Sequence, residues 1–115
     1  MKRILKELNN LSNGLETLAV VTNDGLLKAS IIGDEINPHR FGAICSSLLS
    51  LSKQAALESK RGRFKLLLIE GDEGVMLVVQ VGKKGVLALT SKIGTNLGKL
   101  FIDARVAAKN LEPYI

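Results

Sequence analysis

The sequence predicts an α+β fold: a five-stranded antiparallel sheet with helices on both faces, in the order helix, two strands, helix, three strands, helix. Apolar residues recur at helical spacing in three segments, and five shorter apolar segments are bounded by turn residues. The last three strands are joined by tight turns, and such short connections require antiparallel neighbours. No linker or repeat interrupts the 115 residues, so we expect a single domain over residues 1–115.

The first third of the chain is predicted to form a helix followed by a β-hairpin. The helix spans residues 2–12 and ends at Gly14, since glycine tolerates the left-handed conformation after a helix. A buried strand follows over residues 17–22, and the Asn-Asp-Gly sequence at 23–25 is a strong hairpin signal. The second strand, residues 26–32, has polar side chains on one face, so we expect it at a sheet edge.

The remainder is predicted to form a long helix, three strands and a last helix. Asn37 caps the long helix, which runs over residues 38–61, and Gly62 closes it. The middle strand of the three is apolar on both faces, so it belongs in the interior of the sheet. The strands and the last helix are predicted at residues 63–70, 75–81, 86–90 and 95–111.

Composition limits the classes of function. Hydrophobic residues make up 46% of the chain, with no Trp, one Tyr and three Phe, so we expect an aliphatic core. No apolar run approaches the ~18 residues that cross a bilayer, and the charged N-terminus lacks a signal-peptide core. We therefore expect a cytoplasmic protein without a transmembrane segment. The net charge of +5 favours an acidic partner, an anionic membrane or nucleic acid, but the cations are scattered and no nucleic-acid recognition motif is present.

No catalytic, metal-binding or cofactor-binding constellation stands out. His39 is the only histidine and lies at the start of a predicted helix, while Cys45 falls on an apolar stripe. The carboxylate pairs at 34–35 and 72–73 lie in predicted loops, and there is no phosphate-binding loop. We therefore expect a non-enzymatic protein with no catalytic residue, cofactor or metal.

The long helix, residues 38–61, has two non-polar faces when its residues are placed at 100° per step. The stripe predicted to face the core comprises Phe41, Ile44, Cys45, Leu48, Leu49, Leu51, Ala55 and Ala56. The opposite side carries Gly42, Ala43, Ser46, Ser47, Ser50, Lys53, Gln54 and Leu57. Small neutral residues cost helix propensity but allow a second backbone to approach, so a second surface is expected to cover them. The alternative is a serine-rich helix that is simply exposed.

The strand at 63–70 is strongly hydrophobic and begins the three-strand meander, which places it at a sheet edge. An exposed edge of this kind is an aggregation hazard unless something pairs with it. A symmetric dimer would cover both this strand and the small-residue helix face; the alternative is an edge shielded by its own chain. The predicted dimer interface comprises Ala43, Ser46, Ser47, Ser50, Phe64, Leu66 and Leu68.

Two stretches of the chain resemble the roadblock / dynein light-chain family, whose fold is profilin-like. Leu18-Ala-Val-Val-Thr-Asn-Asp-Gly-Leu26 is similar to the family's strand-turn-strand, and Gly94-Thr-Asn-Leu-Gly-Lys-Leu100 to its step into the last helix. The resemblance covers essentially the whole chain. It implies a homodimer or a dimer with a paralogous protein, formed by joining edge strands and laying the middle helices antiparallel on one face.

The resemblance also implies a function. Prokaryotic members are associated with small Ras-like GTPases as activators or scaffolds, and the GTPase is thought to contact the paired middle helices. Carried over to this chain, the partner-binding residues are Lys53, Gln54 and Leu57. We therefore expect a homodimeric, non-enzymatic regulator or scaffold of a small Ras-like GTPase. The alternatives are a structural dimerisation or tethering module with no effect on GTP turnover, and a nucleic-acid binder, which the charge pattern disfavours.

Overall fold

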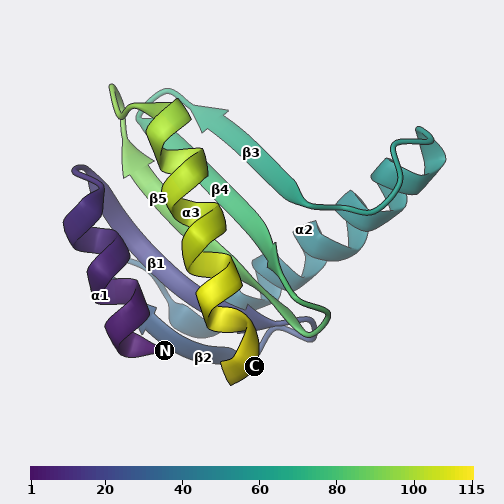
Figure 1. The fold of residues 1–115 in the computed structure, drawn as a ribbon, viewed down its shortest axis with the longest axis horizontal. Helices are drawn as coiled ribbons and strands as arrows, with labels where there is room; N and C mark the ends of the chain where they lie inside the picture. Colours follow the sequence, from purple (N-terminus) through teal and green to yellow (C-terminus); the bar gives the residue numbers. More distant parts are fainter.

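A computed structural model describes all 115 residues and shows one five-stranded sheet with helices on both faces (Figure 1). The strand order is β2-β1-β5-β4-β3 and every neighbouring pair is antiparallel. The predicted fold class and element order are confirmed, as are the two edge strands and the interior position of β4. The elements are α1 Lys2–Leu11, β1 Leu15–Thr22, β2 Leu27–Ile31, α2 Pro38–Glu58, β3 Leu66–Gly71, β4 Gly74–Val81, β5 Gly85–Lys92, α3 Leu97–Leu111 and a 3₁₀ turn, Glu112–Tyr114.

The link between α2 and β3 is longer than predicted, because α2 ends three residues earlier and β3 begins three residues later. Lys60 adopts a left-handed φ of 60°, and the Arg61 N–H donates to the Ala56 carbonyl at 2.7 Å, so the helix stops before Arg61. Gly62 has a φ of 90°, which turns the chain again before the strand. Residues 59–65 therefore connect the helix to the sheet edge without belonging to either.

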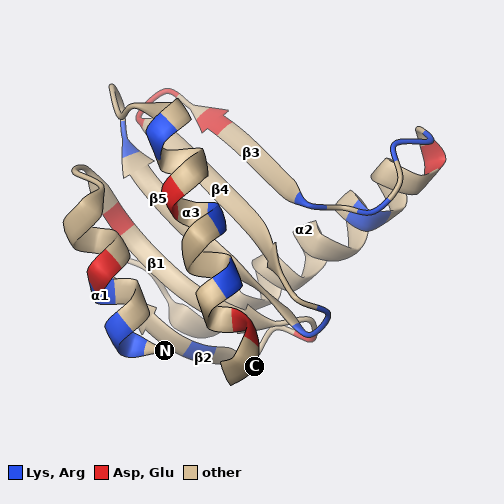
Figure 2. Ribbon diagram, viewed as in Figure 1, with Lys and Arg blue, Asp and Glu red and all other residues tan.

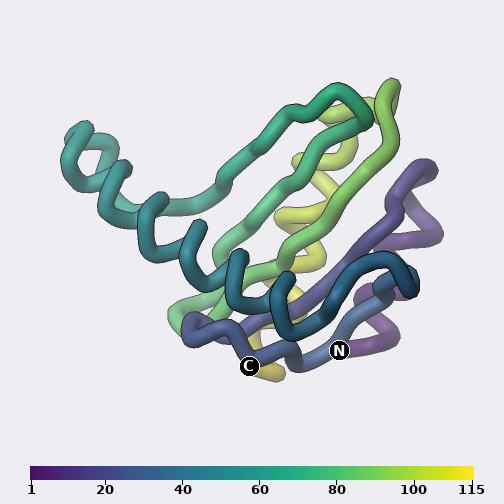
Figure 3. The backbone as a smooth tube through the Cα atoms, turned by 180° about the vertical axis from the view of Figure 1, so that it is seen from behind, coloured from purple at the N-terminus to yellow at the C-terminus, as the bar shows by residue number.

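The core is divided between the two faces of the sheet. On one face α1 and α3 pack side by side over a cluster of 16 buried residues, among them Leu18, Leu77 and Leu89. On the other face α2 covers a cluster of only seven, among them Cys45 and Leu49. Helix α2 packs mainly on β1, β2 and β5, and its C-terminal half diverges from the sheet and projects past β3 (Figures 1 and 3).

The predicted orientation of α2 is wrong in part. Ile44, Leu51 and Ala55 were expected in the core but are exposed. Gly42 was expected on the far side but is buried against the β1–β2 hairpin, and a Cβ atom added there would lie 2.4 Å from the Gly25 carbonyl oxygen. The Ser46 hydroxyl donates to the Asn23 carbonyl at 2.6 Å, on the same side. Close packing on this hairpin rotates α2, and apolar periodicity carries no signal for a contact made by glycine and serine.

Gly42→Ala is expected to destabilise the fold by about 2 kcal/mol, the usual cost of forcing an extra carbon into a packed site. Helix propensity alone predicts the opposite sign, since alanine is about 1 kcal/mol better than glycine inside a helix. Urea unfolding at fixed protein concentration measures the difference. Gly98→Ala in α3 is the matched control, because the atom nearest to an added Cβ there is at 3.5 Å. A stabilising Gly42→Ala would contradict the close approach.

A short polar network ties the C-terminal end of α1 to α3. The Asp103 carboxylate accepts hydrogen bonds from the Lys99 ammonium at 2.7 Å and from the buried Ser12 hydroxyl at 3.0 Å. The same ammonium donates to the Leu11 carbonyl at 2.6 Å, where a positive charge also complements the dipole of α1. The hydrogen bond from Lys99 holds the pKa of Asp103 below its ordinary value of 3.8, and the bond from Ser12 acts in the same direction.

Asp103→Asn is expected to lower the free energy of unfolding by about 1–2 kcal/mol at neutral pH, because it weakens charge-assisted hydrogen bonds. The folded-state pKa of Asp103 is depressed, so its contribution is present above the ordinary value of 3.8 and is lost as pH falls through the lowered pKa. Urea unfolding at several pH values should show the gap between wild type and variant closing below about pH 4. Asp34→Asn, in an exposed loop, is the control. A gap that stays constant into acid would contradict the assignment.

Candidate functional site

From Ala43 to Leu57, about four helical turns of α2, none of the exposed residues is charged. Leu51 is 65% exposed and Ile44 46% exposed, so large apolar side chains lie among small ones. A solvated helix face ordinarily carries Lys, Glu and Gln, and contiguous apolar exposure marks an interaction site. We refer to this surface as the outer α2 face; its residues are Ala43, Ile44, Ser47, Ser50, Leu51, Gln54, Ala55 and Leu57.

The free edge of β3 offers a row of unpaired backbone groups. The Gln80 N–H donates to the Lys65 carbonyl at 3.0 Å, so Lys65 turns its backbone groups toward β4. Backbone direction alternates along a strand, and Leu66, Leu68 and Glu70 therefore point their N–H and C=O groups away from the sheet. Leu68 is also 37% exposed. The edge is thus both apolar and open to hydrogen bonding with another strand.

The outer α2 face and the β3 edge lie next to each other, since α2 projects past β3 and residues 59–65 join the two (Figures 1 and 3). A single partner surface is therefore able to contact both at once. This placement could not be read from the sequence, because it depends on how far α2 diverges from the sheet.

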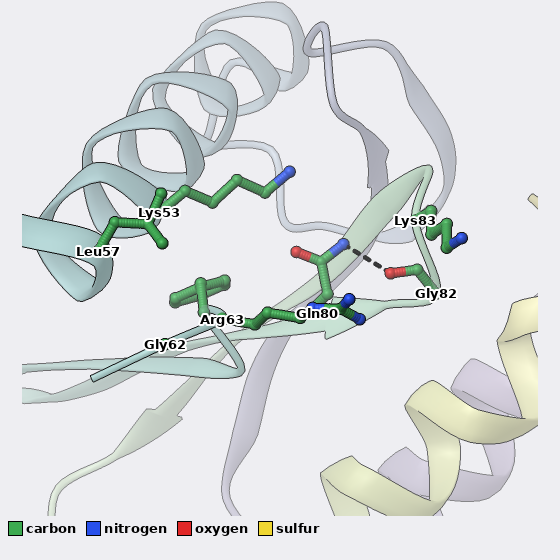
Figure 4. Close-up of a pocket in the computed structure, with 8 residues that line it drawn as sticks. Lys53, Leu57, Gly62, Arg63, Gln80, Gly82 and Lys83 are labelled. Atoms are coloured by element: carbon green, nitrogen blue, oxygen red, sulfur yellow. Dashed lines mark hydrogen bonds between the residues drawn. The ribbon is translucent and has the colours of Figure 1, made fainter. Parts of the chain in front are cut away.

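A pocket of about 340 Å³ opens between the C-terminal half of α2 and the start of β3 (Figure 4). The Gln80 amide spans its floor: the Nε2 group donates to the Gly82 and Gly85 carbonyls at 2.9 and 3.0 Å, while Oε1 is buried without a partner. The Lys53 side chain extends across the opening from α2 (Figure 4). The lining contains three cationic side chains and no carboxylate: Lys53, Leu57, Gly62, Arg63, Phe64, Gln80, Gly82 and Lys83.

The residues predicted for a dimer interface fall into three environments. Ala43, Ser47 and Ser50 are exposed on the outer α2 face. Ser46 is half-buried and bonded to the hairpin, so it does not lie on that face. Of the three residues chosen around β3, Phe64 precedes the strand and packs on the smaller cluster, Leu66 packs on the larger cluster, and Leu68 is exposed at the edge.

The three predicted partner-binding residues divide between two surfaces. Lys53 lines the pocket, Gln54 is exposed on the outer α2 face, and Leu57 belongs to both surfaces. Sequence reasoning missed Arg63, Gln80 and Lys83, which come from the link and the β4–β5 hairpin and meet only in the folded chain. It also missed the exposed apolar members of the outer α2 face. The apolar stripe of the long helix is wider than contact with the core requires, and this extra width was a signal for them.

Cys45, the only cysteine, is buried in the smaller of the two core clusters. Burial raises the pKa of the Cys45 thiol to about 11, so the sulfur stays protonated and unreactive near neutral pH. No three His, Cys, Asp or Glu side chains gather where they would hold a metal ion. None of the helices combines the length and the apolar character needed to cross a membrane.

Residues 2–91 match the family described as Roadblock/LC7 domain. An uncharacterized protein of Methanocaldococcus jannaschii is 31% identical over 110 residues, which cover 96% of this chain and 95% of that protein. A second uncharacterized protein of the same organism is also 31% identical over 110 residues, with the same coverage of both chains.

Several solved structures share the fold. A Roadblock/LC7 domain from Streptomyces avermitilis superposes with a TM-score of 0.91 at 20% identity, covering 99% of this chain and 96% of that one. A structure of MglB with tetrameric arrangement gives a TM-score of 0.85 at 16% identity, covering 96% and 84%. LokiProfilin1, solved in complex with rabbit actin, gives 0.62 at 15% identity, covering 98% and 94%. These likenesses confirm the predicted profilin-like architecture.

Proposed function

This chain belongs to the Roadblock/LC7 domain family, and on that basis we propose that it acts as a homodimeric, non-enzymatic regulator or scaffold of a small Ras-like GTPase in the cytoplasm. The observation that carries the proposal is the outer α2 face lying beside the free β3 edge. Both are apolar, uncovered surfaces of the kind that a partner protein buries. We propose a small GTPase as the partner because prokaryotic family members are associated with small GTPases.

In the proposed dimer, β3 of each copy pairs with β3 of the other, and the two outer α2 faces meet across the same two-fold axis. The outward backbone groups of Leu66, Leu68 and Glu70 then gain hydrogen-bond partners. Ala43, Ser47 and Ser50 are small enough to let two helices approach closely. Burying a leucine or isoleucine side chain in the interface stabilises the dimer by about 1.5–3 kcal/mol. Ile44 and Leu51 would each contribute twice, because each occurs once in both copies.

The GTPase is proposed to bind where the C-terminal half of α2 meets the pocket. Leu57 is 66% exposed and supplies an apolar anchor, while Gln54 adds a polar contact beside it. Lys53, Arg63 and Lys83 give the neighbouring pocket a positive character without a compensating carboxylate. Such a surface suits an acidic patch on the partner, since complementary charge speeds and orients association.

Binding to the small Ras-like GTPases of the same cell, each loaded with GDP or with a non-hydrolysable GTP analogue, tests the proposal. We expect tighter binding in one nucleotide state, and an increase in Kd of about tenfold for Lys53→Glu. Lys6→Glu makes the same charge change on α1 and should leave the affinity unaltered.

Other outcomes of this experiment have distinct meanings. Binding that ignores the nucleotide and leaves GTP turnover unchanged would favour the structural tethering module. The absence of binding by every small GTPase of the cell in both nucleotide states would contradict the regulator and scaffold functions alike.

A further inference from the structure

The two helices on the other side of the sheet from α2 carry most of the net positive charge. Of the 16 cations and 11 carboxylates in the chain, six cations and two carboxylates lie on α1 and α3. These helices therefore account for four of the five net positive charges. Figure 2 shows cations along α3 and at the start of α1. The six are Lys2, Arg3, Lys6, Lys99, Arg105 and Lys109.

Both carboxylates of these helices are already paired within the chain. Glu7 lies 3.7 Å from the Arg3 guanidinium, and Asp103 lies 2.7 Å from the Lys99 ammonium. Every remaining charge on the two helices is therefore an exposed cation with no carboxylate partner. A surface with an uncompensated charge of one sign attracts a partner of the opposite sign. The unpaired cations are Lys2, Lys6, Arg105 and Lys109.

A patch of exposed aliphatic side chains lies among these cations. Leu11 is 62% exposed, Ile102 66% and Val106 56%. Ile102 and Val106 are one helical turn apart on α3, and Leu11 and Val106 line the same hollow between α1 and α3. Single exposed apolar residues are common, but a contiguous group marks an interaction site. We refer to this surface as the outer α1–α3 face; its residues are Lys6, Leu11, Ile102, Arg105, Val106 and Lys109.

The shape of this face suits a flat partner. It consists of the outer surfaces of two helices that pack side by side over the sheet (Figure 1). The hollow between them measures only about 90 Å³, well below the roughly 300 Å³ of a small ligand pocket, and it offers no groove for a peptide helix or strand. A bilayer surface needs no groove, because cations and projecting apolar side chains are sufficient to hold a protein on it.

We infer that the outer α1–α3 face binds the surface of an anionic lipid bilayer. The cations lie at the level of the negative headgroups, and Leu11, Ile102 and Val106 enter the boundary between headgroups and acyl chains. Helix α2 lies on the opposite side of the sheet, so a chain bound in this way leaves the outer α2 face and the pocket free (Figures 1 and 3). The inference goes beyond the proposed function and does not depend on it, because a single copy of the chain supplies the whole face.

Flotation with lipid vesicles at about 0.1 M salt tests the charge requirement. The wild-type chain should float with vesicles of phosphatidylcholine and phosphatidylglycerol in equal parts, and not with phosphatidylcholine alone. Each Lys or Arg near an anionic surface strengthens binding by about fivefold. We therefore expect the partition coefficient of the triple variant to fall by at least about thirtyfold. Its substitutions are Lys6→Glu, Arg105→Glu and Lys109→Glu.

The matched control reverses three exposed cations on α2 and the link that follows it: Arg40→Glu, Lys60→Glu and Arg61→Glu. The change in net charge is the same as in the triple variant. Salt screens charges beyond about 10 Å, so cations on the far side of the sheet contribute little to binding at the outer α1–α3 face. The control should float like wild type, and circular dichroism checks that both variants are folded.

Tryptophan fluorescence tests the orientation of the bound chain independently. The sequence contains no Trp, so Ile102→Trp introduces a single indole on the outer α1–α3 face. Its emission should shift to shorter wavelength when the anionic vesicles are added, because the indole leaves water for the bilayer boundary. Leu26→Trp is the control, since Leu26 is exposed on the β1–β2 hairpin that packs against α2. Its emission should not change.

Three results would overturn the inference. A chain that floats with neither kind of vesicle would leave an acidic protein as the partner of this face. Equal loss of flotation in the triple variant and in its control would mean that net charge, and not this face, governs binding. A shift in the emission of Leu26→Trp without one in Ile102→Trp would place a different surface on the bilayer. None of these results bears on GTPase binding measured without lipid.

Discussion

Ala43→Arg combined with Ser47→Arg is expected to give a folded monomer at concentrations at which wild type is a dimer. Both residues are exposed on the outer α2 face, so the substitutions leave the monomer's own packing intact. In the dimer each arginine occurs twice, and four like charges would enter a close, partly desolvated helix contact. Like-charge juxtaposition in an interface costs several kcal/mol, which corresponds to a rise in the dimer Kd of at least about a hundredfold.

Sedimentation velocity measures this change, and circular dichroism checks that the helices remain. The matched control is Asn10→Arg combined with Asn110→Arg, which places the same added charge on exposed positions of α1 and α3. The control should dimerise like wild type. A dimer that survives the Ala43 and Ser47 substitutions would place the contact elsewhere on the molecule.

Leu68→Pro is expected to weaken dimerisation while sparing the monomer. Proline removes a backbone N–H, and the N–H of Leu68 points out of the sheet toward the proposed partner strand. Edge positions of this kind tolerate proline because no ladder hydrogen bond within the chain is lost. Loss of this hydrogen-bond donor in the middle of the proposed strand pairing should raise the dimer Kd by at least about tenfold.

The next residue supplies the control. Ile69 turns its backbone groups toward β4, opposite Met76, so Ile69→Pro removes part of the monomer's own ladder. It should lower the free energy of unfolding of the monomer by about 3 kcal/mol. Equal effects of the two prolines on monomer stability, with dimerisation unchanged in Leu68→Pro, would contradict the assigned edge geometry.

The sequence was sufficient for the architecture because local signals agree with the global fold. Asn37 caps α2 by accepting a hydrogen bond from the Arg40 N–H, and Asn96 caps α3 in the same way from Lys99. The apolar character of β4 on both faces placed it inside the sheet, and the polar side chains of β2 placed it at an edge. Each of these inferences depended on neighbours along the chain.

The site was only partly predictable because it depends on contacts distant in sequence. The rotation of α2 is set by the approach of Gly42 to Gly25, a contact with no apolar signature. The pocket joins Lys53 to Gln80 and Lys83 through the path of residues 59–65, which no periodicity describes. Ala43, Ser47 and Ser50 were predicted to lie opposite the core-facing stripe of the helix, because small neutral residues are unusual on a solvated helix, and the structure exposes all three.

Sedimentation equilibrium of the wild-type chain at micromolar concentration shows whether a second copy covers the surfaces that the monomer exposes. We expect a species of twice the 12.4 kDa chain mass. A stable species of 12.4 kDa at these concentrations would contradict it, and the proposed surface for a GTPase formed by paired helices would not exist.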